Sequence, residues 1–292
     1  MAIEVSFSDK IFENKRREAG GYSEIALEIR HDIIKSLVLA KSGHSGGPLG
    51  ITDVMSVLFF GGHMKYDPQN GNWDGRDRFV LSSGHMCPVL YSALARAGYF
   101  PIDELKTLRK WGTRLQGHPG LDMELPGIES STGSLGQGIS IAVGMALSDK
   151  LVDRNDKKVF CLTGDGELQE GASWEAAMSA AHYGLDNLCW IVDNNDCQID
   201  GRCPDVMNIY PLEEKFASFN FEVVTVDGHN YDEIQAAYDK FEENRKNKVG
   251  KPFVIIAKTF MGKGVSFMHD QYSWHGNPPN EEQAIKALEE LV

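Results

Sequence analysis

The stretch KVFCLTGDGELQEGASWEAAMSAAHYGLDNLCWIVDNND, residues 158–196, decides the fold. Two short apolar runs, at 158–163 and 188–193, flank a segment at 172–184 that is long enough for a helix. Continuous apolar runs are typical of strands that are buried on both faces of a sheet. The stretch therefore predicts a strand, helix and strand unit of a parallel sheet.

The rest of the chain repeats this pattern. Further apolar or β-branched runs lie at 78–83, 221–226 and 253–259. Segments of helical spacing or length lie at 22–40, 52–60, 137–152 and 230–247. Alternating strands and helices predict an α/β fold with a single doubly wound, mostly parallel sheet and helices on both faces.

The domain organisation follows from the absence of any repeat or linker in the sequence. We expect one domain over residues 1–292, with an N-terminal helical extension at about 1–40 and a C-terminal helix at about 280–292. This length lies within the range of a large single domain.

Composition excludes several classes of function. The formal net charge of −13, with no local run of Lys and Arg, argues against binding to nucleic acid or anionic lipid. The first residues lack the apolar centre of a signal peptide, and no run approaches a membrane span, so we expect a cytoplasmic protein. The five cysteines include no Cys-x-x-Cys pair, which indicates free thiols rather than disulfides or a zinc site.

Polar residues follow the predicted strands, where ligands bind in open parallel sheets. Asp165 lies between Gly164 and Gly166 after one strand, and Asn195 follows the next. A carboxylate and an amide oxygen form an incomplete Mg²⁺ site that phosphate oxygens would complete. The flanking glycines let backbone N–H groups approach a phosphate.

Other interpretations of these motifs are weaker. Gly-Asp-Gly alone is usually a turn, and an asparagine pair often caps a helix. An EF-hand starting at Asp193 would need Gly in place of Gln198 and Glu in place of Pro204. The Walker loop is absent, and GSLGQG at 133–138 lacks the preceding strand of a dinucleotide site. A diphosphate bound through a metal remains.

GDG, followed after about thirty residues by NN, resembles the thiamine diphosphate signature. The whole stretch from GDG to NN, residues 164–195, is similar to the transketolase version of this signature. Six further motifs resemble transketolase motifs in the same order: SGHSGGPLG at 42–50, RDRFVLSSGH at 76–85, GHP at 117–119, STGSLGQG at 131–138, KTFMGKG at 258–264 and WHG at 274–276. The resemblance implies the thiamine diphosphate-binding fold and transfer of a two-carbon ketol unit from a ketose phosphate to an aldose acceptor.

The resemblance also assigns residues to the metal and the cofactor. It implies that Asp165, Asn195 and the backbone carbonyl of Cys197 bind Mg²⁺, or Ca²⁺ or Mn²⁺. It implies thiamine diphosphate contacts from His85, Gly133, Ser134, Leu135, Gly136, Gly164, Asp165, Gly166, Glu167, Asn195, Lys263 and His275. The glycine-rich turn before the 137–152 segment suits this role, because a helix start offers free N–H donors to an anion.

Catalytic roles follow from the same resemblance. It implies that His44 and His118 hydrogen-bond the donor sugar, that His275 takes part in proton transfer, and that Glu170 communicates with the neighbouring subunit. Imidazole suits proton transfer because its ordinary pKa of about 6.5 is close to neutrality. We expect the remaining histidines to be structural: His31, His63, His182, His229 and His269.

Full-length transketolases continue into a pyrimidine-binding domain that supplies the acid activating the cofactor. The resemblance therefore implies a separate C-terminal subunit carrying that domain, in an α2β2 heterotetramer. Ser45, Gly46, Gly47, Ser83 and Ser134 depart from the common full-length pattern and resemble the short, separately encoded subunits. Two alternatives stay open: a subunit of another thiamine diphosphate enzyme, such as a 2-oxo acid dehydrogenase or deoxyxylulose phosphate synthase, and a non-catalytic binding subunit.

Overall fold

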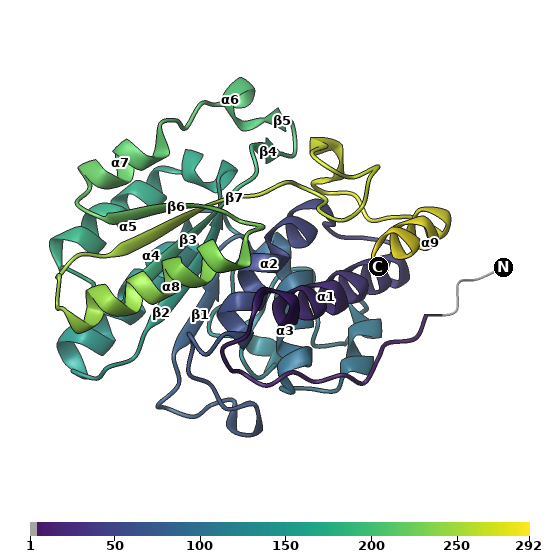
Figure 1. Ribbon diagram of the computed structural model, residues 1–292, viewed down its shortest axis with the longest axis horizontal. Coiled ribbons are helices and arrows are strands. Elements are labelled where there is room, and N and C mark those ends of the chain that lie inside the picture. The colour runs from purple at the N-terminus through teal and green to yellow at the C-terminus, as the bar shows by residue number, and fades with distance from the viewer. Residues whose placement is uncertain (1–4) are drawn as a thin grey trace.

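A five-stranded parallel sheet forms the centre of the computed structural model, which describes residues 5–292 (Figure 1). Its strand order is β1-β2-β3-β7-β6. The strands are β1 (Arg78–Leu81), β2 (Val159–Gly164), β3 (Leu188–Asn194), β6 (Glu222–Asp227) and β7 (Phe253–Lys258). A short antiparallel hairpin, β4 (Cys197–Gln198) with β5 (Gly201–Arg202), follows β3. The five predicted strands are confirmed.

Helices cover both faces of the sheet, as Figure 1 shows. One face packs against α1 (Ala19–Ala40), α2 (Gly46–Phe60), α3 (Cys87–Ala97) and α8 (Tyr231–Lys246). The other packs against α4 (Gln137–Leu147), α5 (Gly171–His182) and α7 (Leu212–Ser218). The short α6 (Cys203–Val206) follows the hairpin, and α9 (Glu281–Glu290) lies near the C-terminus. The predicted doubly wound α/β fold is confirmed.

Helix α2 begins at Gly46, six residues before the predicted start at Thr52, inside the glycine-rich stretch. All 15 of its residues are buried. A Cβ at Gly46 would lie 2.4 Å from Cγ of Met261, and one at Gly50 would lie 2.8 Å from the carbonyl oxygen of Phe260. These glycines therefore allow a loop to pack against the helix, and this packing outweighs the helical cost of glycine.

The N-terminal segment differs from the predicted helical extension. The helix starts at Ala19, residues 5–18 are irregular, and residues 1–4 of the prediction lie outside the described part of the chain. Arg96, fully buried in α3, holds the irregular segment by donating to the carbonyls of Ser8 (3.0 Å) and Lys10 (2.9 Å). Arg96 also pairs with buried Asp32, which balances its charge.

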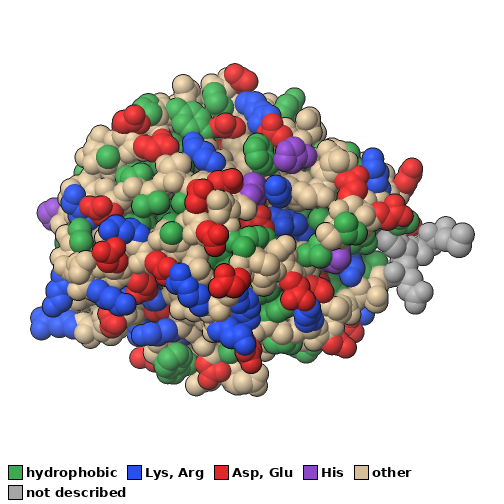
Figure 2. All heavy atoms as spheres, in the orientation of Figure 1, with side chains coloured by type: hydrophobic (Ala, Val, Ile, Leu, Met, Phe, Trp, Pro, Cys, Tyr) green, Lys and Arg blue, Asp and Glu red, His purple; other side chains and the backbone are tan. Residues whose placement is uncertain are grey.

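The strand register places the site. Gly164 at the end of β2 lies opposite Asp193 of β3, and Asn194 lies opposite Lys258 of β7. The residues that follow these strands therefore emerge at one edge of the sheet. Acidic and basic side chains are interspersed over the face shown in Figure 2. Within residues 5–292, no helix is long and apolar enough to cross a membrane.

Candidate active site

A cleft of about 440 Å³ lies beyond the carboxyl ends of β1, β2 and β3. Thirteen predicted site residues line it: His44, His85, His118, Gly133, Leu135, Gly164, Asp165, Gly166, Glu167, Glu170, Asn195, Cys197 and His275. It is also lined by Gly47, Ser83, Met86, Gln169, Asp193, Gln198, Ile199 and Met261. The structure thus brings together residues from eight separate segments of the sequence.

Asp165 lies on the floor of the cleft, with its carboxylate buried. It accepts hydrogen bonds from the backbone N–H groups of Gly166 (2.7 Å) and Asp196 (2.6 Å) and from the Asn194 amide (3.1 Å). Burial raises its pKa to about 6, and the contacts that oppose this rise come from neutral donors. A divalent cation would supply the charge that these donors lack.

Asn195 has a defined amide orientation. Its Nδ2 donates to Oδ2 of Asp193 at 2.8 Å, so its Oδ1 is the end left to meet a cation, and this oxygen also accepts from the Cys197 N–H at 2.9 Å. Asp165, Asn195 and a Cys197 carbonyl would form an oxygen-only ligand set, which suits Mg²⁺. Three protein oxygens would leave octahedral positions that ligand oxygens could complete. Within residues 5–292, no group of three His, Cys, Asp or Glu side chains could hold a metal.

The glycine-rich turn before α4 borders the cleft. Gly133 and Gly136 have φ values of 137° and 79°, a region that glycine adopts without strain. A Cβ at Gly133 would lie 2.7 Å from the His118 ring. The glycines thus allow a tight turn from which Gly133 and Leu135 line the cleft. In the first turn of α4, the N–H groups of Gln137 and Ile139 donate to the Ser134 carbonyl and to Ser82 Oγ.

Glu167 supports this turn. Its buried carboxylate accepts from the hydroxyls of Ser82 and Ser83 and from the Gly136 N–H at 2.8 Å. Ser83 Oγ in turn accepts from the Gly164 N–H at 2.6 Å. Burial raises the Glu167 pKa, and these donors oppose the rise. The carboxylate predicted to contact cofactor therefore joins the ends of β1 and β2 to α4.

Four histidines from separate segments line the cleft close to one another. Ring centroids lie 5.0 Å apart for His44 and His85, 5.7 Å for His44 and His275, and 6.4 Å for His44 and His118. Burial, with smaller contributions from His275, His118 and Arg109, lowers the His44 pKa to about 4. Burial also lowers the pKa values of His85, His118 and His275. All four imidazoles are therefore neutral at pH 7.

Two of these rings carry buried nitrogens without a protein partner. Nδ1 of His44 and Nδ1 of His275 are inaccessible to solvent and make no hydrogen bond within residues 5–292. A buried polar atom without a partner is costly, so a bound molecule that supplies one would be stabilised here. The residues present fit a polar ligand next to the anion and metal positions.

The cleft does not gather every predicted residue. The lining does not include Ser134, Gly136 or Lys263. The Gly136 N–H donates to Glu167, which does line the cleft. Asp193 and Met261 line the cleft although neither was predicted to have a role in the site. Both had a visible signal, because Asp193 directly precedes the asparagine pair and Met261 lies within the KTFMGKG motif at 258–264.

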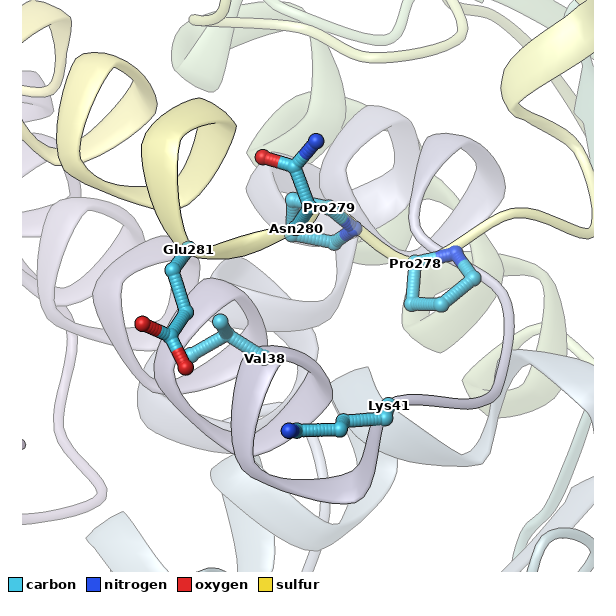
Figure 3. A pocket seen from close by; sticks show the side chains of 6 residues that line it. All are labelled: Val38, Lys41, Pro278, Pro279, Asn280 and Glu281. Carbon is cyan, nitrogen blue, oxygen red and sulfur yellow. The ribbon is translucent and has the colours of Figure 1, made fainter. Parts of the chain in front are cut away.

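A second hollow shares no lining residue with the cleft. Its volume is about 350 Å³, and it lies between the end of α1 and the start of α9 (Figure 3). It is lined by Val38, Lys41, Pro278, Pro279, Asn280 and Glu281. None of these residues is a predicted site residue, so the cleft at the strand ends is the candidate active site.

Fold and cleft together define an α/β protein that can hold a diphosphate at the carboxyl ends of parallel strands. The family described as "Transketolase, thiamine diphosphate binding domain" matches residues 23–291. The chain therefore belongs to the transketolase family, as the resemblance predicted. As a member, it is a thiamine diphosphate-dependent subunit of a ketol-transferring enzyme.

Individual relatives agree with this membership. The chain is 42% identical to the 6-deoxy-6-sulfo-D-fructose transketolase subunit SqwG of Clostridium sp. (strain MSTE9), over 92% of this chain and 98% of the relative. It is 37% identical to an apulose-4-phosphate transketolase subunit of Phocaeicola vulgatus, over 90% of each. The transketolase structure from Campylobacter jejuni matches with a TM-score of 0.82 and 37% identity, over 94% of this chain and 42% of that one. The chain thus spans under half of a full-length transketolase.

Proposed function

We propose that this chain is the amino-terminal subunit of a split transketolase that acts with a separate C-terminal subunit carrying the pyrimidine-binding domain. The complex, an α2β2 heterotetramer in the cytoplasm, transfers a two-carbon ketol unit from a ketose phosphate to an aldose acceptor. The observation that carries the proposal is the cleft, which brings His44, His118 and His275 together with Asp165, Asn195 and Gly133. The match to subunits of nearly equal length supports the separate partner.

In this proposal, Asp165, Asn195 and the Cys197 carbonyl hold Mg²⁺, with Ca²⁺ and Mn²⁺ as alternatives. The diphosphate is bound by His85, by the Gly133–Gly136 turn, and by Gly164 and Gly166, with Lys263 adding charge. When bound, thiamine diphosphate supplies the electron sink that is needed to break the bond between C2 and C3 of the ketose.

The protein's own groups orient the sugar and move its protons. His44 and His118 hydrogen-bond the hydroxyl and carbonyl of the donor, and His275 exchanges protons with the sugar hydroxyl. Their lowered pKa values support these roles, because a neutral imidazole offers both a donor and an acceptor nitrogen. Glu170, at the exposed rim of the cleft, faces the partner subunit.

The substrate is an anionic sugar in this proposal, with pentose phosphates as the default. The relatives' names refer to a sulfonated fructose and to apulose 4-phosphate, which are both anionic. Arg109 supports the same class: its guanidinium lies 3.5 Å from the Gly117 carbonyl, next to His118, and its charge helps burial to lower the His118 pKa.

The test is an assay of the chain together with a pyrimidine-domain subunit from the same genome. Xylulose 5-phosphate with ribose 5-phosphate should yield a seven-carbon ketose only when both chains, Mg²⁺ and thiamine diphosphate are present. His44→Ala should abolish the reaction, whereas His182→Ala, on the exposed end of α5, should not. Release of carbon dioxide from a 2-oxo acid, without ketol transfer, would contradict the proposal.

A further inference from the structure

His229 lies outside the cleft, directly after β6, and was expected to be structural. Its side chain is 8% exposed, and its Nδ1 lies 2.8 Å from Oδ2 of Asp53. Its Nε2 accepts a hydrogen bond from the Phe260 N–H at 3.0 Å. A backbone N–H can only donate, so Nε2 must be unprotonated and the ring proton lies on Nδ1, facing Asp53. His229 thus links a buried carboxylate to the backbone of the loop after β7.

The carboxylate is a fixed anchor. Asp53 belongs to α2, and it also accepts from Arg30 of α1 at 2.8 Å and from the Tyr231 hydroxyl of α8 at 2.7 Å. Burial alone would raise its pKa, but Arg30, His229 and Tyr231 outweigh burial and lower the pKa to about 2. Three helices therefore converge on one charged group that His229 contacts from the loop side.

The loop on the other side of His229 reaches the cleft at two points. Thr259 Oγ1 donates to Asp193, the carboxylate that fixes the amide of Asn195. Met261 lines the cleft, and the next residue, Gly262, donates its N–H to the Gly46 carbonyl at 2.8 Å. The backbone of Phe260, which His229 holds, lies between Thr259 and Met261.

We propose that His229 is a positioning residue for the metal and cofactor site. By holding the Phe260 N–H, it keeps Thr259 against Asp193, so that the Asn195 oxygen points toward the metal position, and it keeps Met261 in the cleft wall. The inference rests on the proposed function only in requiring that this cleft binds Mg²⁺ and thiamine diphosphate.

Two substitutions separate the two hydrogen bonds of the ring. In His229→Asn, the amide nitrogen can replace Nδ1 and keep the bond to Asp53, but the side chain is too short to reach Phe260. In His229→Gln, the longer side chain can place its amide oxygen near the position of Nε2 and accept from Phe260, while Asp53 loses a partner. We therefore expect His229→Asn to weaken binding at the metal and cofactor site, and His229→Gln to lower the stability of the fold.

The experiment measures both properties in the complex with the partner subunit. Calorimetry gives the dissociation constant of Mg²⁺ and thiamine diphosphate, and urea unfolding of the same complex gives the midpoint of the unfolding transition. His229→Asn should weaken binding by about tenfold or more, in the range typical of residues that orient metal ligands, with a midpoint near wild type. His229→Gln should bind within about twofold of wild type but unfold at lower urea. His182→Asn should change neither property.

Binding by His229→Asn equal to that of wild type would overturn the inference. So would a loss of binding in both variants that follows their loss of stability, because His229 would then be only structural. If the wild-type complex does not bind Mg²⁺ and thiamine diphosphate, the proposed function fails together with the inference. If it binds them but transfers no ketol unit, the function fails while the His229 comparison still decides the inference.

Discussion

Replacing Glu167 with Gln removes a buried charge from the group that joins β1, β2 and α4. Three donors converge on the carboxylate: Ser82, Ser83 and the Gly136 N–H. Hydrogen bonds to charged groups contribute about 1.5–3 kcal/mol and neutral ones about 0.5–1.5 kcal/mol, so the three bonds together weaken by about 3 kcal/mol. Part of this loss is offset because Gln is neutral and avoids the cost of burying a charge, which is the cost that raises the Glu167 pKa. We expect a net loss of about 1–2 kcal/mol in the free energy of unfolding.

Glu167→Ala should cost more, because it leaves the buried Gly136 N–H and the Ser82 hydroxyl without their acceptor. At about 1–3 kcal/mol for each unsatisfied group, the expected loss is about 3–5 kcal/mol. The assay is urea unfolding at pH 7.5, followed by tryptophan fluorescence, and Glu175→Gln on the exposed face of α5 is the matched control, expected within about 0.5 kcal/mol of wild type. Equal unfolding of all three variants would refute the joining role of Glu167.

Three further predictions concern packing and protonation. Gly138→Ala should lose about 1–3 kcal/mol of stability, because its Cβ would lie 2.6 Å from Cα of Ser82. Gly144→Ala on the same helix meets nothing within 4 Å and should gain up to about 1 kcal/mol; urea unfolding showing the same sign for both would contradict this. Burial lowers the His63 pKa to about 4, so its neutral form stabilises the fold above pH 6.5 and this contribution is lost as pH falls toward 4. Between pH 7.5 and pH 5, wild type should lose about 2 kcal/mol more than His63→Gln; parallel losses would contradict the assignment. The His44 ring should titrate near pH 4 by NMR, whereas a midpoint near 6.5 would show that it is not buried as described.

Asp165 and Asn195 illustrate what can be predicted from the sequence. Each follows an apolar run that forms a parallel strand, and the opposition of Gly164 and Asp193 brings them to one edge. This geometry follows from strand type and direction alone, because the carboxyl ends of parallel strands share an edge. The approach of Asp165 and Asn195 at one edge of the sheet could therefore be predicted from the sequence.

Long-range contacts were not accessible in this way. Glu167 stands beside the Gly-Asp-Gly motif, but its partners Ser82 and Ser83 lie 85 and 84 positions away, so its supporting role had no local signal. His229 contacts Asp53, 176 positions away. The early start of α2 was missed for a related reason, since the packing that allows glycine in that helix comes from a distant loop.

The most direct test of the account is ketol transfer by the complete complex with and without the Asp165 carboxylate. Asp165→Ala should reduce transfer from xylulose 5-phosphate by more than about a hundredfold. This loss is larger than the loss typical of residues that only orient metal ligands. The matched control, Asp205→Ala on the exposed α6, should retain wild-type activity. Unchanged activity in Asp165→Ala would contradict the assignment of this cleft as the metal and diphosphate site.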